Sequence, residues 1–127
     1  MLFDHTKKIW PEPFSAVVNG SKPFEVRTSD EPWNTGETLL LREWNPTTYE
    51  NLCNAAKVAP YPSRDEIDRH KISADCQAMR DEANAMAYTG QSYACRVTYI
   101  VKPGTWGLPS NIIVFGIEPL SAKGATQ

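Results

Sequence analysis

Hydrophobic residues along this chain recur with two periods, which predict short strands and a few helices. From Tyr93 to Val101 every second residue is apolar, and this alternation predicts a strand with one buried face. The three consecutive leucines from Leu39 to Leu41 predict a strand that is buried on both faces or lies in a barrel. We expect strands at residues 5–9, 24–27, 37–44, 92–101 and 111–117.

A helix is expected directly after the first strand. Pro11 and Pro13 favour its first turn, where the missing backbone N–H of proline costs nothing. Asn19-Gly20 is expected to end it, because glycine adopts the left-handed conformation that follows many helices. The apolar residues at helical spacing are Trp10, Phe14, Val17 and Val18.

Residues 48–87 have a different, helical pattern. A first helix is expected at residues 49–58, and Ser63 with Glu66 has the spacing of a capping box that begins another. An apolar stripe follows at spacings of three and four residues, which is typical of a packed helix face. Its members are Ile72, Cys76, Met79, Ala83 and Met86. This region is expected to be a helical insertion, which either packs against the main body or binds a protein partner.

Together these elements predict an α+β fold: a small, mostly antiparallel β-barrel with an N-terminal helix and a helical insertion at about residues 48–87. A length of 127 residues suits a single domain, residues 1–127. No apolar run reaches the roughly 20 residues that span a bilayer, and the N-terminus lacks a signal-peptide pattern, so we expect no membrane contact and a cytoplasmic location.

Composition excludes several kinds of site. The cysteines at positions 53, 76 and 95 are widely spaced and form no CxxC pair, so we expect free thiols and no metal. No phosphate-binding P-loop, GxSxG or HExxH motif occurs, and we expect no cofactor. A net charge of −2 excludes a general basic coat for nucleic acid and restricts any such binding to a local patch or pocket.

The strongest candidate site is the segment Gly20 to Arg27, with Lys22, Glu25 and Arg27. Lys22 is suited to a phosphate or a base carbonyl, or to nucleophilic or base chemistry, and otherwise is a solvated turn lysine. Glu25 is suited to accept hydrogen bonds from a base, or to pair with Arg27 or Arg42. Arg27 either contacts phosphate or a base, or orients Glu25. In a strand, Glu25 and Arg27 share one face.

Three further residues are candidates for ligand binding. His5 is suited to ligand contact or proton relay, with a surface role as the alternative. Trp33 and Trp106 lie in predicted loops, where exposed indoles stack on unpaired bases. Trp10 and Trp44 are expected in the core.

Five separated motifs resemble those of a known family. Gly20-x-Lys22-x-x-Glu25-x-Arg27 resembles the GxKxxExR signature of ASCH domains in the PUA-like superfamily. The likeness is closer to an ASCH-related family of unknown function and covers about residues 5–46 and 88–118. The other motifs are His5-Thr-Lys-Lys-Ile9, Trp10-Pro-Glu-Pro-Phe14, Leu41-Arg-Glu-Trp44 and Arg96-Val-Thr-Tyr-Ile100.

This resemblance implies a PUA-like barrel whose cleft binds RNA, a nucleotide or a modified base. Some proteins of similar fold are enzymes, including nucleases and an amidohydrolase that acts on acetylated cytidine. Lys22 occupies the position of that amidohydrolase's lysine, and Glu25 stands where it has a threonine. We therefore expect a binding domain; the alternatives are a small hydrolase with Lys22 and Glu25 as catalytic groups, and a protein-interaction module.

Overall fold

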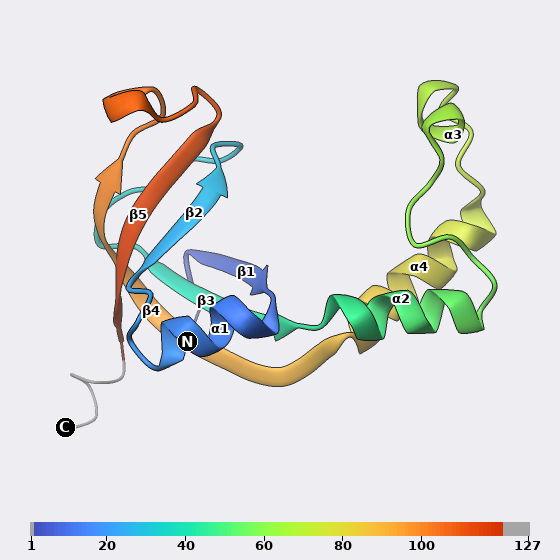
Figure 1. Ribbon diagram of the computed structural model, residues 1–127, viewed down its shortest axis with the longest axis horizontal. Coiled ribbons are helices and arrows are strands. Elements are labelled where there is room, and N and C mark those ends of the chain that lie inside the picture. The colour runs from blue at the N-terminus through green and yellow to red at the C-terminus, as the bar shows by residue number, and fades with distance from the viewer. Residues whose placement is uncertain (1, 121–127) are drawn as a thin grey trace. The chain divides into compact units, whose positions relative to one another are not determined.

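The structure is a computed structural model that describes residues 2–120. The described chain forms two compact units, one made of residues 2–43 and 91–120 and the other of residues 44–90. The first unit contains the curled sheet, and the second is helical (Figure 1). None of the helices in the described part of the chain has the length and apolar character needed to cross a membrane.

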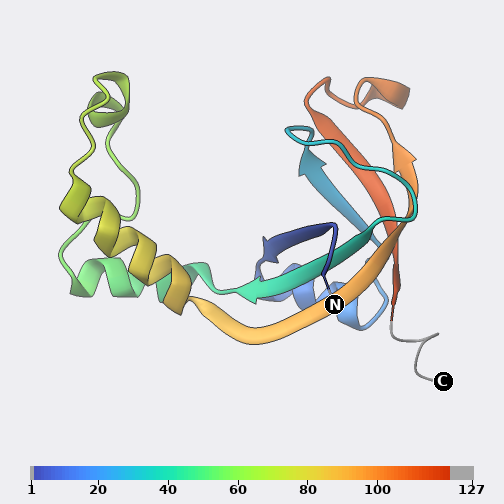
Figure 2. The ribbon, with the colours of Figure 1, turned by 180° about the vertical axis from the view of Figure 1, so that it is seen from behind.

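The sheet has five strands in the order β1-β3-β4-β5-β2 and curls into a half-barrel (Figures 1 and 2). This mixed α+β architecture confirms the fold class at the level of a small barrel-like sheet with helices. The elements are β1 His5–Ile9, α1 Pro11–Val18, β2 Phe24–Thr28, β3 Thr38–Trp44, β4 Tyr88–Val101 and β5 Ile112–Pro119, with a short 3-10 turn at Thr105–Gly107.

Strand pairing is mixed, and it leaves the sheet open. β1 pairs with β3 in parallel, whereas β5 pairs antiparallel with both β2 and β4. The two edge strands are β1 and β2, which are the strands on either side of α1 in the sequence. An open sheet leaves backbone donors and acceptors unpaired along both of its edges.

The core lies on the concave side of the curled sheet. α1 contributes Phe14 and Val17, and β3 contributes Leu39 and Leu41, whose side chains are fully buried. Phe115 from β5 is also fully buried in this cluster. Val18, expected on the same helix face, is exposed. The predicted end of α1 is confirmed: Asn19 caps the helix, and Gly20 follows with φ of 86°.

The regular alternation predicted for β4 is wrong beyond Val97. A register shift between Val97 and Tyr99 places Tyr99 opposite Gly116 and Val101 opposite Val114. An extra residue in one strand reverses which face the following side chains occupy. Val97 therefore lies in the core, whereas Tyr99 is exposed on the outer face.

β2 has its apolar side chains outside. Phe24 and Val26 are exposed, while Glu25 is buried and Arg27 half-buried on the opposite face. The predicted alternation of β2 is thus confirmed. Because β2 is an edge strand, the inner face of β2 borders the open side of the sheet, where charged side chains keep access to a ligand or to water.

The helical unit contains α2 (Pro46–Ala55), α3 (Arg64–Asp68) and α4 (Ala74–Met86). α2 begins three residues before the predicted helix, because the Asn45 side chain accepts hydrogen bonds from the backbone N–H groups of Thr47 and Thr48. The capping box of Ser63 and Glu66 is confirmed. α2 and α4 pack together, and Trp44 is buried in their core as predicted.

The apolar stripe predicted for α4 is only partly buried. Ala83 is buried and Cys76 packs against the core of the unit, but Met79 and Met86 are exposed. Arg80, which was not part of the predicted stripe, is instead buried, with 4% of its surface exposed. Its guanidinium donates to the carbonyl oxygen of Ala59 at 2.8 Å. The buried face of α4 thus contains a hydrogen-bonded cation where methionines were expected.

We predict that Gly116→Ala destabilises the sheet. A Cβ atom there would lie 2.6 Å from Oγ1 of Thr98, whose β-branched side chain has little rotamer freedom. Overpacking of this kind costs about 1–3 kcal/mol. Urea denaturation of Gly116→Ala alone and in a Thr98→Ala background measures the effect. The cost is expected to fall sharply in the second background, and an equal cost in both would contradict the explanation.

Candidate ligand pocket at the open edges of the sheet

A hollow of about 280 Å³ lies where the edge strands β1 and β2 approach each other beside α1. We call it the seam pocket. It brings together all three charged residues predicted from the Gly20 to Arg27 segment. Its lining residues are Lys8, Ile9, Trp10, Pro13, Lys22, Glu25, Val26 and Arg27.

Glu25 is the centre of the pocket's charge arrangement. Its side chain is only 5% exposed, and both of its carboxylate oxygens are bonded to cations. Nζ of Lys22 donates to Oε1 at 2.9 Å, and Arg27 donates to Oε2 from Nη2 at 2.7 Å and from Nε at 3.1 Å. The ion pair with Arg27 is the alternative that the sequence left open, and Glu25 additionally pairs with Lys22.

Arg27 also connects the two edges of the sheet. Its Nη2 donates to the backbone carbonyl of Lys8 at 3.1 Å, so one guanidinium contacts both β1 and Glu25 of β2. A planar guanidinium with several donors in fixed directions suits this double contact better than an ammonium group does. The bridge maintains a defined spacing at a place where no backbone ladder joins the strands.

The turn after α1 fixes the position of Lys22. The left-handed Gly20 reverses the chain, and the backbone N–H of Lys22 donates to the carbonyl of Ala16 at 3.0 Å. From there Nζ reaches Glu25 and the carbonyl of Phe24, at 3.1 Å. A GxK sequence directly after a helix therefore has a geometric role: it aims an ammonium group at the edge of β2.

Donors remain for a ligand after these contacts. An ammonium group has three N–H donors, and Lys22 uses two of them within the described chain. Arg27 uses Nε and Nη2, while its Nη1 makes no hydrogen bond to any residue between 2 and 120. Burial lowers the pKa of Lys8, which also lines the pocket. The donors that Lys22 and Arg27 leave unused favour an anionic ligand.

Trp10 supplies an aromatic surface that was not predicted. It was expected in the core, but it is 57% exposed and lines the seam pocket. Trp10 caps α1 with extended backbone angles, φ −71° and ψ 158°, so its side chain does not follow the buried face of the helix. The Trp10-Pro11 pair could have indicated this exposure, because a residue before proline is disfavoured in the helical conformation.

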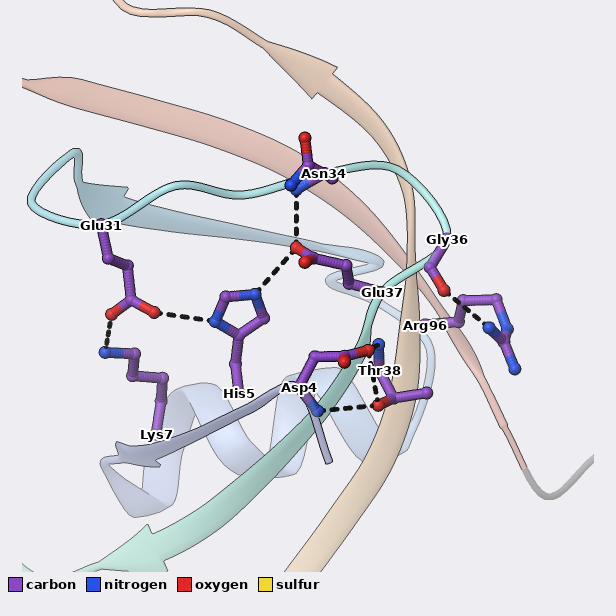
Figure 3. A network of polar contacts seen from close by, with 9 residues as sticks. All are labelled: Asp4, His5, Lys7, Glu31, Asn34, Gly36, Glu37, Thr38 and Arg96. Carbon is purple, nitrogen blue, oxygen red and sulfur yellow. Dashed lines mark hydrogen bonds and ion pairs between the residues drawn. The ribbon is translucent and has the colours of Figure 1, made fainter. Parts of the chain in front are cut away.

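His5 lies outside the seam pocket, in a separate polar network (Figure 3). Trp33 also lies outside the pocket, and its ring stacks on that of His5. Nδ1 of His5 is 2.7 Å from Oε2 of Glu31, and Nε2 is 2.8 Å from Oε1 of Glu37. Lys7 also donates to Glu31. Carboxylate oxygens accept hydrogen bonds, so the protonated ring, which donates from both nitrogens, satisfies both contacts. Neither ring nitrogen is left for a ligand.

The interpretation of Trp33 as a base-stacking platform does not fit its position. Trp33 is 7% exposed, and its ring stacks on His5 at 3.8 Å and on Phe115 at 4.5 Å between centroids. The loop thus places its indole in the core. Its N–H finds no hydrogen-bond partner among residues 2–120. Trp106 is 78% exposed, as a loop tryptophan was expected to be, but it does not line the seam pocket.

The network of His5 lowers the pKa values of two carboxylic acids. The hydrogen bond from Lys7 is the main cause for Glu31, and the hydrogen bond from His5 is the main cause for Glu37. Because these contacts join β1 to the loop before β3, they hold the loop that carries Trp33. Within the described chain, no cluster of His, Cys, Asp and Glu side chains is arranged to hold a metal ion.

We predict that Glu37→Gln reduces the loss of unfolding free energy that the protein shows when the pH is lowered. The folded pKa of Glu37 lies below its ordinary value of 4.5, so its contribution to stability is complete above that pH and is lost as the pH falls through the folded pKa. Urea denaturation between about pH 6 and about pH 3 should show a smaller loss of unfolding free energy than in the wild type. Glu50→Gln, at an exposed site on α2, is the matched control. An unchanged pH slope would contradict the role of Glu37.

Comparison with known proteins gives a family likeness without an activity. Residues 4–59 match a family described as Domain of unknown function (DUF3850). No curated protein matches the chain. The matched segment includes β1, α1 and β2, and with them every residue that lines the seam pocket.

Proposed function

We propose that this protein binds a nucleotide, either free or as part of RNA, in the seam pocket. The observation that supports this most directly is that cationic groups with unused N–H donors and an exposed indole line the same pocket. Lys22 and Arg27 retain N–H groups after pairing with Glu25, and Trp10 lines the same hollow. Phosphate oxygens suit such donors, and a base suits the face of an indole.

Size and charge support a ligand of about one nucleotide. Ligand pockets commonly measure about 300–1,000 Å³, and the hollow of about 280 Å³ lies just below that range. It suits a single base with its sugar and phosphate at the rim. Lys22 and Arg27, against the carboxylate of Glu25, supply a local positive charge that the net charge of −2 does not.

The fold supports the same proposal. The curled sheet, the helix between β1 and β2, and the GxKxxExR segment at the pocket fit the PUA-like architecture expected from the resemblance to ASCH domains. We propose that the chain is a divergent member of that superfamily, in which the residues of 44–90 form an added helical unit.

Binding is favoured over hydrolysis by the state of Glu25. A general base needs an oxygen directed at the substrate proton. Both oxygens of Glu25 are instead engaged by Lys22 and Arg27, which favours a role in orienting those cations. The hydrolase alternative, with Lys22 and Glu25 as catalytic groups, requires one of these contacts to break when a substrate binds.

We predict that Trp10→Ala weakens nucleotide binding while Trp106→Ala does not. Both indoles are exposed, so neither change is expected to destabilise the core, but only Trp10 lines the seam pocket. Stacking contributes about 1–3 kcal/mol per base, which corresponds to a loss of roughly 5-fold to 150-fold in affinity. Isothermal titration with AMP, GMP, CMP and UMP measures it. Failure of all four, and of a short RNA, to bind the wild type would overturn the proposal.

Lys22→Ala tests the electrostatic part of the same proposal. Loss of a charge-assisted hydrogen bond to phosphate should weaken binding about 10-fold or more. Lys71→Ala, which removes an exposed lysine from the helical unit, is the matched control. The corresponding nucleosides, which lack phosphate, should bind wild type and Lys22→Ala with similar affinity, and an equal loss for both would argue that Lys22 acts only by maintaining the fold.

A further inference from the structure

The hydrogen bonds of β2 alternate along the strand. At one end the N–H of Ile117 donates to the carbonyl of Pro23 at 3.1 Å, and at the other the N–H of Ser29 donates to the carbonyl of Asn111 at 2.8 Å. In an antiparallel ladder, residues that bond to the partner strand alternate with residues whose backbone groups point away. The odd-numbered residues of β2 therefore bond to β5.

The even-numbered residues of β2 direct their backbone groups to the open edge. β2 has no neighbour on that side in the sheet order. The carbonyl of Phe24 confirms the direction, because it accepts a hydrogen bond from Nζ of Lys22 across the open edge. The next even residue is Val26, which lies between Glu25 and Arg27 and lines the seam pocket. Its N–H and C=O thus face the hollow as an adjacent donor and acceptor.

We propose that the backbone N–H and C=O of Val26 bind the hydrogen-bonding edge of the nucleobase in the seam pocket. This inference rests on the proposed function and specifies how the base is recognised. Uracil and guanine each present a ring N–H beside a carbonyl, which complements a backbone N–H and C=O in the way that a second strand would. The base completes, over one residue, the ladder that β2 lacks on its open edge.

The surrounding contacts agree with this placement. The side chains of Glu25 and Arg27, on either side of Val26, are fixed by their mutual ion pair. The bridge from Arg27 to the carbonyl of Lys8 holds the opposite edge in place, so the strand backbone is presented at a defined position. If main-chain groups recognise the base, a substituent on its pairing edge should weaken binding. A substituent elsewhere on the base should leave binding nearly unchanged.

Methylated nucleotides test the inference from the ligand side. UMP, N3-methyl-UMP and 5-methyl-UMP are titrated into the full-length chain by calorimetry, together with GMP and N1-methyl-GMP. A methyl group on the pairing edge should weaken binding about 10-fold or more, as expected for loss of a bidentate contact. The 5-methyl group, which leaves that edge intact, should change affinity less than about 3-fold.

Val26→Pro tests it from the protein side. Proline removes the N–H of Val26, which the ladder to β5 does not use, and proline is tolerated at such positions of edge strands. The variant should bind UMP and GMP about 5-fold or more weakly than Val26→Ala, which also loses the valine side chain but keeps the N–H, as expected for loss of one hydrogen bond. Circular dichroism and thermal melting verify that both variants are folded; if Val26→Pro unfolds, the methylated nucleotides decide alone.

The outcomes separate this inference from the proposed function. If UMP and GMP bind in a manner that depends on Trp10 and Lys22, but the edge-methylated forms bind equally well, the function stands and recognition by Val26 is overturned. If neither nucleotide binds the wild type more tightly than about 1 mM, recognition of these bases by Val26 is overturned. Selective loss with edge methylation and with Val26→Pro supports it.

Discussion

The buried carboxylate of Glu25 is the contact on which the arrangement of the open side of the sheet depends. It holds Lys22 from the turn after α1 and Arg27 from its own strand, and Arg27 in turn bonds to the carbonyl of Lys8 on β1. Three segments that backbone hydrogen bonds leave unconnected at this place are thereby joined. Removing one partner of a buried ion pair strongly destabilises the fold, because the other charge is then left buried without a counter-charge.

The contacts of Glu25 and Arg27 are important because the sheet is open between β1 and β2. In a closed barrel, a ladder between β1 and β2 would hold the two edges together and would fill the space between them. Here the guanidinium of Arg27 spans the edges, and the space beside it is the seam pocket. The same arrangement that stabilises the opening therefore places cationic donors in it, so stability and ligand binding share their residues.

The sequence predicted much of this site, because its main residues lie close together along the chain. Lys22, Glu25 and Arg27 fall within six positions, and the turn and strand that hold them follow local rules of glycine and alternation. His5 and Trp33 were assigned to the same ligand site, but they lie outside the seam pocket and stack on each other. Nothing local distinguishes a loop indole that packs on a distant phenylalanine from one that faces water.

The sequence by itself determined how many strands form and where they lie along the chain. It also determined that α1 begins at the prolines and ends before Gly20, and that Glu25 and Arg27 share one face. These features follow from backbone preferences within a few residues. Tertiary structure alone decided that Tyr99 turns outward, that Trp10 lies at the pocket and that the two sheet edges meet through Arg27. Each of these depends on a register or contact between segments far apart in the chain, where packing of the whole sheet outweighs local preference.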